Sequence, residues 1–205
     1  MKPAYRPYAS VDIETTGIGE DAEVLQIAGV IDDGISPIDQ LKTIDLKIKY
    51  KTLGYSEPFA LMLNAGLIAD MSNRELKDDF FKPAAAAIGL IDFVNEAFNI
   101  TKEYDEANDI RMKGKVIFAG KNYASFDDPK IRNFLSKYAP DVLKEYNHLA
   151  SYKTLDVGSM YYLDFGYNPS LSQINELTGR TEVTHKALDD AFDVVYAVRK
   201  KANLL

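Results

Sequence analysis

Three extended segments come before any helical pattern in this chain, and that order restricts the fold it can adopt. Residues 8–13 and 24–33 are rich in β-branched and aromatic residues, and a short turn joins them. Residues 43–48 alternate apolar and polar side chains with a period of two. We therefore expect three strands in an antiparallel meander at the start of the chain.

Helical spacing begins after these strands. Apolar residues recur every three or four positions over residues 83–98, where an early proline and four alanines favour a helix. Residues 101–115 are charged and poorly periodic, which indicates a connection, and an apolar strand is expected at 116–119. Further helical segments are expected at 127–138, 155–163, 171–177 and 187–200, with a glycine stop at 178–180.

This order of elements predicts an α/β fold, with a mixed sheet that has an antiparallel edge and is flanked by helices. The composition is that of an ordinary globular domain, and we expect one domain over residues 1–205. The chain has no cysteine, which excludes disulfides, zinc–thiolate sites and cysteine nucleophiles. It shows no signal-peptide core and no apolar run of membrane-spanning length, so we expect a soluble, cytoplasmic protein that is not exported.

Acidic residues stand out within the apolar segments. Asp12 and Glu14 are two residues apart on an expected strand, so their carboxylates share one face. If that face is buried, two like charges need a cation, another partner or a proton. The alternative is an exposed strand with an acidic solvent face.

Two later segments supply further candidates. Asp127 follows the strand at 116–119 and begins the next helix, close to the sheet edge where α/β sheets place their sites. Asp190 and His185 lie at the start of the last helix. The helix dipole alone is an alternative reason for these acids, and for Asp128 beside Asp127. The only other histidine, His148, has no ligand-spaced partner and is interpreted as structural or surface.

Four carboxylates and one histidine fit one chemistry, the attack of water on a phosphodiester assisted by divalent ions. Mg²⁺ and Mn²⁺ prefer oxygen ligands, and two such ions about 3.5–4 Å apart stabilise the attacking and leaving oxygens. A histidine, which ordinarily titrates near neutral pH, is suited to act as the general base.

The ordered motifs DIETTG, NYASFD and HKALDD resemble those of the DEDD (DnaQ-like) 3′–5′ exonuclease superfamily, and HKALDD matches the H-x-A-x-x-D signature of its histidine subclass, DEDDh. The resemblance implies an RNase H-like mixed sheet and release of nucleoside monophosphates from DNA or RNA ends. It also implies that two Mg²⁺ or Mn²⁺ ions are held by Asp12, Glu14, Asp127 and Asp190, and that His185 is the general base.

The same resemblance indicates eight residues that contact the terminal nucleotide, namely Thr15, Thr16, Gly17, Ile18, Met62, Asn64, Asn122 and Phe126. For Ile18 and Met62 the alternative is ordinary core packing. For Asn122 the alternative is capping of the following helix.

The net charge of −7 excludes a generic basic nucleic-acid coat and favours a short single-stranded 3′ end as partner. A modest basic edge is formed by Lys121, Lys130, Arg132 and Lys137, whose alternative role is a solvated helix face. The stretch around residues 122–163 resembles oligoribonucleases, whereas DIETTG is the form common in proofreading and single-strand exonucleases, so single-stranded DNA and short RNA both remain open.

The sequence leaves open two other functional classes and the formation of a homodimer. The first class is a catalytically inactive nucleic-acid-binding or accessory module of the same fold. The second is another metal-dependent phosphotransfer or hydrolytic enzyme, although no glycine-rich P-loop is present. A homodimer is compatible with tyrosine-rich segments at Tyr138, Tyr146, Tyr152, Tyr161 and Tyr162.

Overall fold

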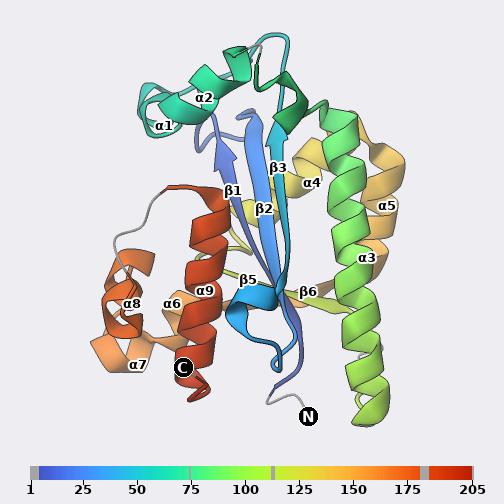
Figure 1. The fold of residues 1–205 in the computed structure, drawn as a ribbon, viewed down its shortest axis with the longest axis vertical. Coiled ribbons are helices and arrows are strands. Elements are labelled where there is room, and N and C mark those ends of the chain that lie inside the picture. The colour runs from blue at the N-terminus through green and yellow to red at the C-terminus, as the bar shows by residue number, and fades with distance from the viewer. Residues whose placement is uncertain (1–4, 74, 112–113, 181–184, 205) are drawn as a thin grey trace.

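A mixed sheet of six strands forms the centre of the computed structural model, which describes residues 5–73, 75–111, 114–180 and 185–204 (Figure 1). The strand order is β4-β3-β2-β1-β5-β6. Strands β1, β2 and β3 pair antiparallel, while β5 runs parallel to β1, β6 to β5 and β4 to β3. The strands are β1 (Tyr8–Thr15), β2 (Val24–Asp32), β3 (Lys42–Ile48), β4 (Phe80–Phe81), β5 (Val116–Gly120) and β6 (Ala150–Asp156). The predicted fold class and the antiparallel meander are therefore confirmed.

Helices cover both faces of the sheet (Figure 1). One face packs against α3 (Pro83–Ala107), α4 (Asp127–Tyr138) and α5 (Pro140–Leu149), and the other against α9 (Ala187–Lys201). The short helices α1 (Pro58–Leu63) and α2 (Ala65–Ser72) lie beyond the end of β1 (Figure 1). The remaining helices are α6 (Val157–Met160), α7 (Tyr162–Phe165) and α8 (Leu171–Thr178), and short 3₁₀ turns occur at Ile38–Gln40 and Lys77–Asp79.

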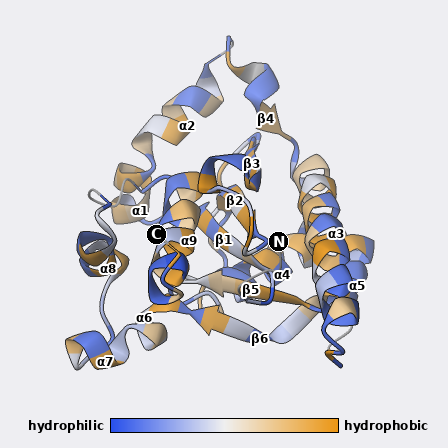
Figure 2. Cartoon of the chain, turned by 60° about the horizontal axis from the view of Figure 1, so that its bottom comes forward, coloured by the Kyte–Doolittle hydropathy of each residue, from blue (hydrophilic) through white to orange (hydrophobic). Residues whose placement is uncertain are grey.

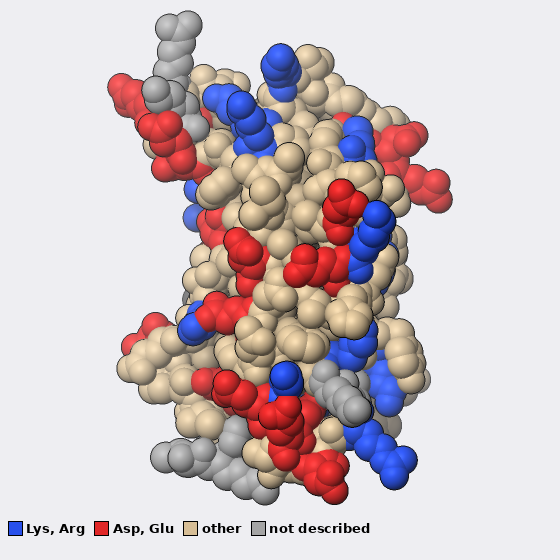
Figure 3. All heavy atoms as spheres, turned by 90° about the vertical axis from the view of Figure 1, so that its right-hand side faces the viewer, with Lys and Arg blue, Asp and Glu red and all other residues tan. Residues whose placement is uncertain are grey.

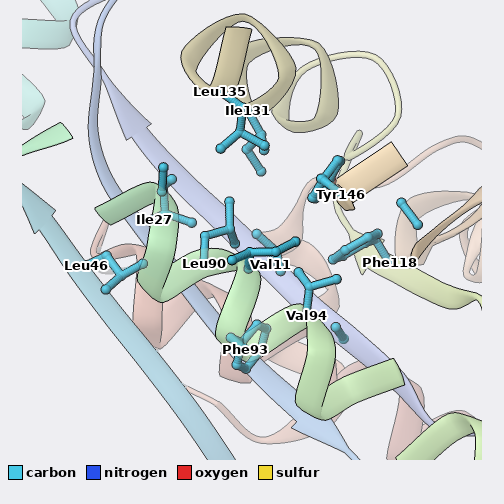
Figure 4. Packing of buried hydrophobic residues seen from close by; sticks show 14 of the residues in the cluster. Val11, Ile27, Leu46, Leu90, Phe93, Val94, Phe118, Ile131, Leu135 and Tyr146 are labelled. Atoms are coloured by element: carbon cyan, nitrogen blue, oxygen red, sulfur yellow. The ribbon is translucent and has the colours of Figure 1, made fainter. Parts of the chain in front are cut away.

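Side chains alternate across β1, so one face of the strand is apolar and packs into the core while the other carries acidic residues. Ala9, Val11 and Ile13 belong to the main core with Leu90 and Val94 of α3, part of which is shown in Figure 4. The intervening residues, which include Asp12 and Glu14, point to the α9 face. Hydrophobic residues recur along the strands and on the helix faces that meet them (Figure 2). Within the described part of the chain, no helix is both long and apolar enough to span a bilayer.

One glycine lets α3 approach the sheet closely. Gly29 of β2 faces Phe93, and a Cβ at this position would lie 2.9 Å from the Phe93 ring and 3.2 Å from the backbone oxygen of Ser10. A larger residue here would push the helix away from the strand.

The predicted connection at 101–115 is wrong over its first half, because α3 continues to Ala107. The buried positions of its last turns carry Thr101 and Asp105, four residues apart, so polar residues hide the helical period. Asp105 is only 1% exposed, and its two carboxylate oxygens each accept a 2.8 Å hydrogen bond from the Arg6 guanidinium. A buried ion pair therefore occupies a place that the pattern would assign to an apolar residue.

The predicted helix at 155–163 is wrong at its start. Leu155 and Asp156 belong to β6, an edge strand with half-exposed side chains and therefore no clear alternation. The Asp156 carboxylate accepts a 2.7 Å hydrogen bond from the backbone N–H of Ser159, so the residue that ends the strand also caps α6. Residues 157–163 then contain α6 and the start of α7.

Candidate active site

Three carboxylates from two distant segments meet at the α9 face of the sheet. Asp12 and Glu14 lie on β1, and Asp190 lies in the first turn of α9. One carboxylate oxygen from each lies within 4.8 Å of those of the other two. Asp190 is 7% exposed, so this group lies between elements rather than on an open surface.

Local structure explains why these residues converge. Strand alternation places Asp12 and Glu14 on the same side of β1 as Ser10. The Ser10 hydroxyl donates a 2.8 Å hydrogen bond to the backbone oxygen of Ala191, which docks the start of α9 against the strand. Asp190 is the residue before Ala191, so this contact brings its carboxylate to the acidic face.

Asp127 comes from α4, which packs on the face of the sheet opposite α9. It is the first residue of α4, directly after the loop that follows β5, and it is 3% exposed. Its carboxylate is not one of the three whose oxygens lie within 4.8 Å of one another. Its charge nevertheless raises the pKa of Asp12. Burial raises the pKa of Asp127 to about 8, although hydrogen bonds from the backbone N–H groups of Ile13 and Asp127 oppose the increase.

Two of the other carboxyl groups, those of Asp12 and Glu14, also have raised pKa values. Burial, followed by the charges of Asp127, Asp190 and Glu14, raises the pKa of Asp12 well above its usual range. Burial raises the pKa of Glu14 to about 7, against a hydrogen bond from Asn64 that lowers it. These shifts favour the protonated carboxyl groups where no cation compensates the negative charge, and an all-oxygen donor set fits Mg²⁺ or Mn²⁺.

His185 lies two residues before α9 begins and five residues before Asp190 along the chain. Its side chain is exposed and its backbone has a φ of 53°, a left-handed conformation that is uncommon outside glycine. It lines a cavity of about 470 Å³ together with Asn64, Gln26 and Lys47. Gln26 pairs with Glu14 in the sheet, whereas Asp12, Glu14, Asp127 and Asp190 are not among the residues that line this cavity. No motif in the sequence marks Gln26 or Lys47 as a site residue.

The turn after β1 contains four of the predicted substrate residues. The Thr15 hydroxyl donates to the backbone oxygen of Gly17 at 2.8 Å, and the Thr16 hydroxyl donates to that of Tyr55 at 2.6 Å. Both threonine side chains therefore build the turn. Ile18 is 78% exposed and Met62, in α1, is 64% exposed. The core-packing alternative is wrong for both residues.

Asn64 is buried at the junction of α1 and α2, where its side-chain amide donates to the backbone oxygens of Thr15 and Ala60, both at 3.2 Å. This contact and its hydrogen bond to Glu14 make it a link between α1 and the acidic group.

Asn122 is exposed and has a φ of 65°. Its side-chain oxygen accepts from Lys121 at 3.1 Å, and α4 has no side-chain cap at its own N-cap residue, Phe126. The capping alternative is therefore wrong for the Asn122 side chain. Phe126 is half-buried and packs against the main core.

The predicted basic edge does not present free cations. Lys130 is only 6% exposed and bonds backbone oxygens, which contradicts a solvated helix face. The three remaining side chains are also engaged, Lys121 with Asn168, Arg132 with Asp128, and Lys137 with Glu23. On the face of the molecule shown in Figure 3, Lys and Arg are interspersed with Asp and Glu, with no continuous basic tract.

Two of the five tyrosines predicted at a dimer surface are in the core instead. Tyr146 and Tyr161 are buried, because their rings pack within hydrophobic clusters of the chain itself. Tyr152 and Tyr162 are exposed. His148 is exposed near the end of α5, in agreement with its interpretation as a surface residue.

A mixed sheet with an antiparallel meander, parallel strands beyond β1 and helices on both faces is an RNase H-like fold, as the sequence predicted. The structure is similar to E. coli Exonuclease I in complex with a dT13 oligonucleotide (TM-score 0.63, 17% identity, 97% of this chain and 42% of that chain). It is also similar to the zinc-bound E. coli ExoI–ssDNA complex (TM-score 0.64, 14% identity, 96% of this chain and 41% of that chain).

Exonuclease I from Methylocaldum szegediense is a further structural neighbour (TM-score 0.62, 17% identity, 96% of this chain and 41% of that chain). This chain therefore spans less than half the length of these exonucleases. No protein-family description matches the sequence, and no curated protein matches it either. At these identities the likeness concerns the fold.

Proposed function

We propose that this chain is a divalent-metal-dependent 3′–5′ exonuclease of the DEDDh type that releases nucleoside monophosphates from single-stranded DNA or short RNA. The observation that carries the proposal is the group of carboxylates from Asp12, Glu14 and Asp190, with oxygens within 4.8 Å of one another on the α9 face. Asp127 adds a fourth acid whose charge acts on Asp12. The fold shared with Exonuclease I, which has been seen in complex with dT13 and dA16, supports the same reaction.

The four carboxylates are proposed to hold two Mg²⁺ or Mn²⁺ ions. Two such ions, when bound, would supply an activated water nucleophile and would neutralise negative charge on the phosphate and the leaving oxygen. The chain contributes fixed oxygen ligands, because Asp12 and Glu14 are set by the sheet and Asp190 by the docking of α9. This rigidity avoids reorganisation of the ligands during the reaction.

His185 is proposed to act as the general base. An imidazole nitrogen of His185 accepts a proton from the attacking water and the new P–O bond forms. The bond to the 3′ oxygen of the penultimate nucleotide breaks, and this oxygen takes a proton from solvent to become the new 3′ hydroxyl. The His185 side chain is exposed and is one of the residues that line the cavity, which leaves the imidazole accessible to solvent and substrate.

The substrate is proposed to be a short single-stranded 3′ end. Ile18 and Met62 offer exposed apolar side chains to the terminal base, and Phe126 lies near the sugar. The backbone of Thr15 to Gly17 and the side chains of Asn64 and Asn122 complete the contacts. A net charge of −7 and the engaged lysines favour few phosphate contacts.

The test is a time course with 5′-labelled single-stranded DNA and RNA oligonucleotides in Mn²⁺, in Mg²⁺ and in EDTA. We expect a ladder that shortens from the 3′ end in either metal and stays intact in EDTA, and the ratio of the DNA and RNA rates gives the substrate preference. Oligonucleotides that are bound but intact in every lane would contradict the enzyme and indicate a binding module.

A further inference from the structure

The turn that joins β1 to β2 is held from two sides by charged side chains. One carboxylate oxygen of Glu57 accepts hydrogen bonds from the backbone N–H groups of Ile18 and Gly19, both at 3.2 Å. The ammonium of Lys130 donates to the backbone oxygens of Ile18, at 3.1 Å, and Gly19, at 2.7 Å. The peptide groups of both turn residues are therefore fixed at their N–H and their C=O.

Glu57 connects this turn to α1. It is the N-cap residue of α1, and its backbone N–H donates to the backbone oxygen of Thr16 at 2.7 Å. The Tyr55 hydroxyl donates to the same Glu57 carboxylate oxygen at 3.0 Å and orients it. Gly17 leaves room for the carboxylate, because a Cβ there would lie 2.7 Å from the Glu57 Cδ. One side chain thus sets the turn relative to the helix that carries Met62.

Lys130 connects the turn to α4, three residues after Asp127. Its side chain is almost fully buried, and its ammonium lies 5.2 Å from the centre of the Phe126 ring. A buried ammonium needs compensating acceptors, and the two turn carbonyls provide them. The turn is therefore tied to the helix that supplies the fourth acid.

These contacts matter for Ile18 in particular. Its side chain is 78% exposed, so its own packing cannot hold it in one place. A side chain that receives a nucleobase binds more tightly if its backbone is already ordered, because the entropy of ordering is not lost on binding.

We propose that Glu57 and Lys130 are positioning residues that hold Ile18 in the orientation that receives the terminal nucleotide. Neither residue contacts the substrate. This inference rests on the proposed exonuclease function and adds to it the two side chains that shape the nucleotide site.

A purely electrostatic role for Glu57 and a positioning role predict opposite effects of its removal on substrate binding. Removal of a negative charge beside a site for a polyanion should tighten binding. The hydrogen bonds of Glu57 and Lys130 with Ile18 and Gly19 form a clamp on the turn, and removal of this clamp should weaken substrate binding. The direction in which KM changes in Glu57→Ala therefore distinguishes the electrostatic role from the positioning role.

The experiment measures kcat and KM on a 5′-labelled single-stranded DNA oligonucleotide in Mn²⁺ for wild type, Glu57→Ala and Glu57→Gln, with Glu20→Gln as the matched control. Glu20 is an exposed acid on the same turn, so its variant removes a nearby charge without removing the clamp. We expect Glu57→Ala to raise KM by about tenfold with kcat within about twofold. Glu57→Gln keeps an acceptor oxygen and should recover most of the affinity, and Glu20→Gln should leave KM unchanged or lower.

A second variant tests the other side of the turn. Lys130→Met keeps the apolar stem beside Phe126 and removes the ammonium, so we expect KM to rise by a similar factor. Loss of a clamp persists at high salt, whereas loss of a distant charge is screened. Thermal unfolding of each variant gives the folded fraction used in the kinetics.

Backbone amide exchange tests the clamp itself. Glu57→Ala should accelerate exchange at Ile18 and Gly19 by about tenfold or more, with no such change in Glu20→Gln. If wild type cleaves DNA while Glu57→Ala matches its KM, or binds more tightly, the positioning role is wrong. If wild type leaves every oligonucleotide intact, the proposed function fails instead, and unchanged exchange at the two amides would overturn the clamp separately.

Discussion

Asp12, Glu14 and Asp127 are held together at a cost to the metal-free fold. Their pKa values are raised, and burial is the largest cause for each. Stability alone would not select such a group, since apolar residues would fill the same space without repulsion. Groups whose environment opposes ionisation are concentrated at functional sites, which agrees with a role in binding cations.

This cost predicts a pH dependence for the metal-free protein. A carboxyl whose pKa is raised in the folded state binds its proton more tightly folded than unfolded, so stability falls as pH rises from about 4, the unfolded pKa. For Glu14 and Asp127 the loss extends to about 7 and about 8. We expect the melting temperature in EDTA to fall between about pH 5 and about pH 8, and Mn²⁺ to reverse the fall at the upper end. A melting temperature that rises over this range would contradict the buried acidic group.

Asp12→Asn should abolish hydrolysis and also stabilise the metal-free protein near pH 8. The amide removes one of the mutually repelling charges but keeps the shape of the side chain. Activity on labelled DNA and thermal unfolding in EDTA check the two effects. Asp39→Asn, at an exposed position in the 3₁₀ turn before β3, is the matched control and should change neither.

His185→Ala should lower kcat by roughly 10²–10⁴ if His185 is the general base. Metal binding should persist, because the four acids remain, and isothermal titration with Mn²⁺ checks this. His148→Ala removes the chain's other histidine from an exposed site on α5 and should leave kcat unchanged. Full activity in His185→Ala would remove the histidine from the mechanism.

Helix α3 depends on a buried ion pair near its end. Asp105 accepts from Arg6 through both carboxylate oxygens and also from the backbone N–H of Gly114, at 2.8 Å. The element thereby joins the start of the chain and the approach to β5, and it extends well past the apolar stretch that the sequence pattern marks.

Asp105→Ala should therefore destabilise the protein by about 3–5 kcal/mol, because it leaves a largely buried guanidinium, on a side chain 13% exposed, without its carboxylate. Urea unfolding measures this change. The control is Glu106→Ala, one residue further on, where the ion pair to Lys102 is exposed and spans 3.9 Å. We expect the control to change the free energy of unfolding by less than about 0.5 kcal/mol. Equal effects of the two substitutions would show that the buried pair has no special role.

The charge of the molecule as a whole limits how it can hold nucleic acid. The chain carries a net charge of −7. The basic side chains near Asp127 already bond other protein groups, namely Lys121, Lys130, Arg132 and Lys137. We expect a plot of log K against log salt for single-stranded DNA with a slope of magnitude about 2 or less, equivalent to roughly three phosphate contacts. Fluorescence anisotropy in Ca²⁺ measures the slope, and a much steeper one would reveal a basic path.

The sequence by itself determined the elements with strong local periodicity and the acids that alternate along them. The meander, the strand at 116–119 and the helices at 127–138 and 187–200 follow from apolar spacing, which reports the buried face of each element. The same alternation gave Asp12 and Glu14 a common side, because it depends only on neighbouring residues.

Tertiary structure alone decided the remainder. The end of α3 and the end of β6 differ from the sequence pattern because buried polar pairs and an exposed edge replace the apolar signal. The bonds from Glu57 and Lys130 to Ile18 span 39 and 112 residues. Local spacing carries no information about partners so far apart, since only the packing of α1 and α4 around the sheet brings them together.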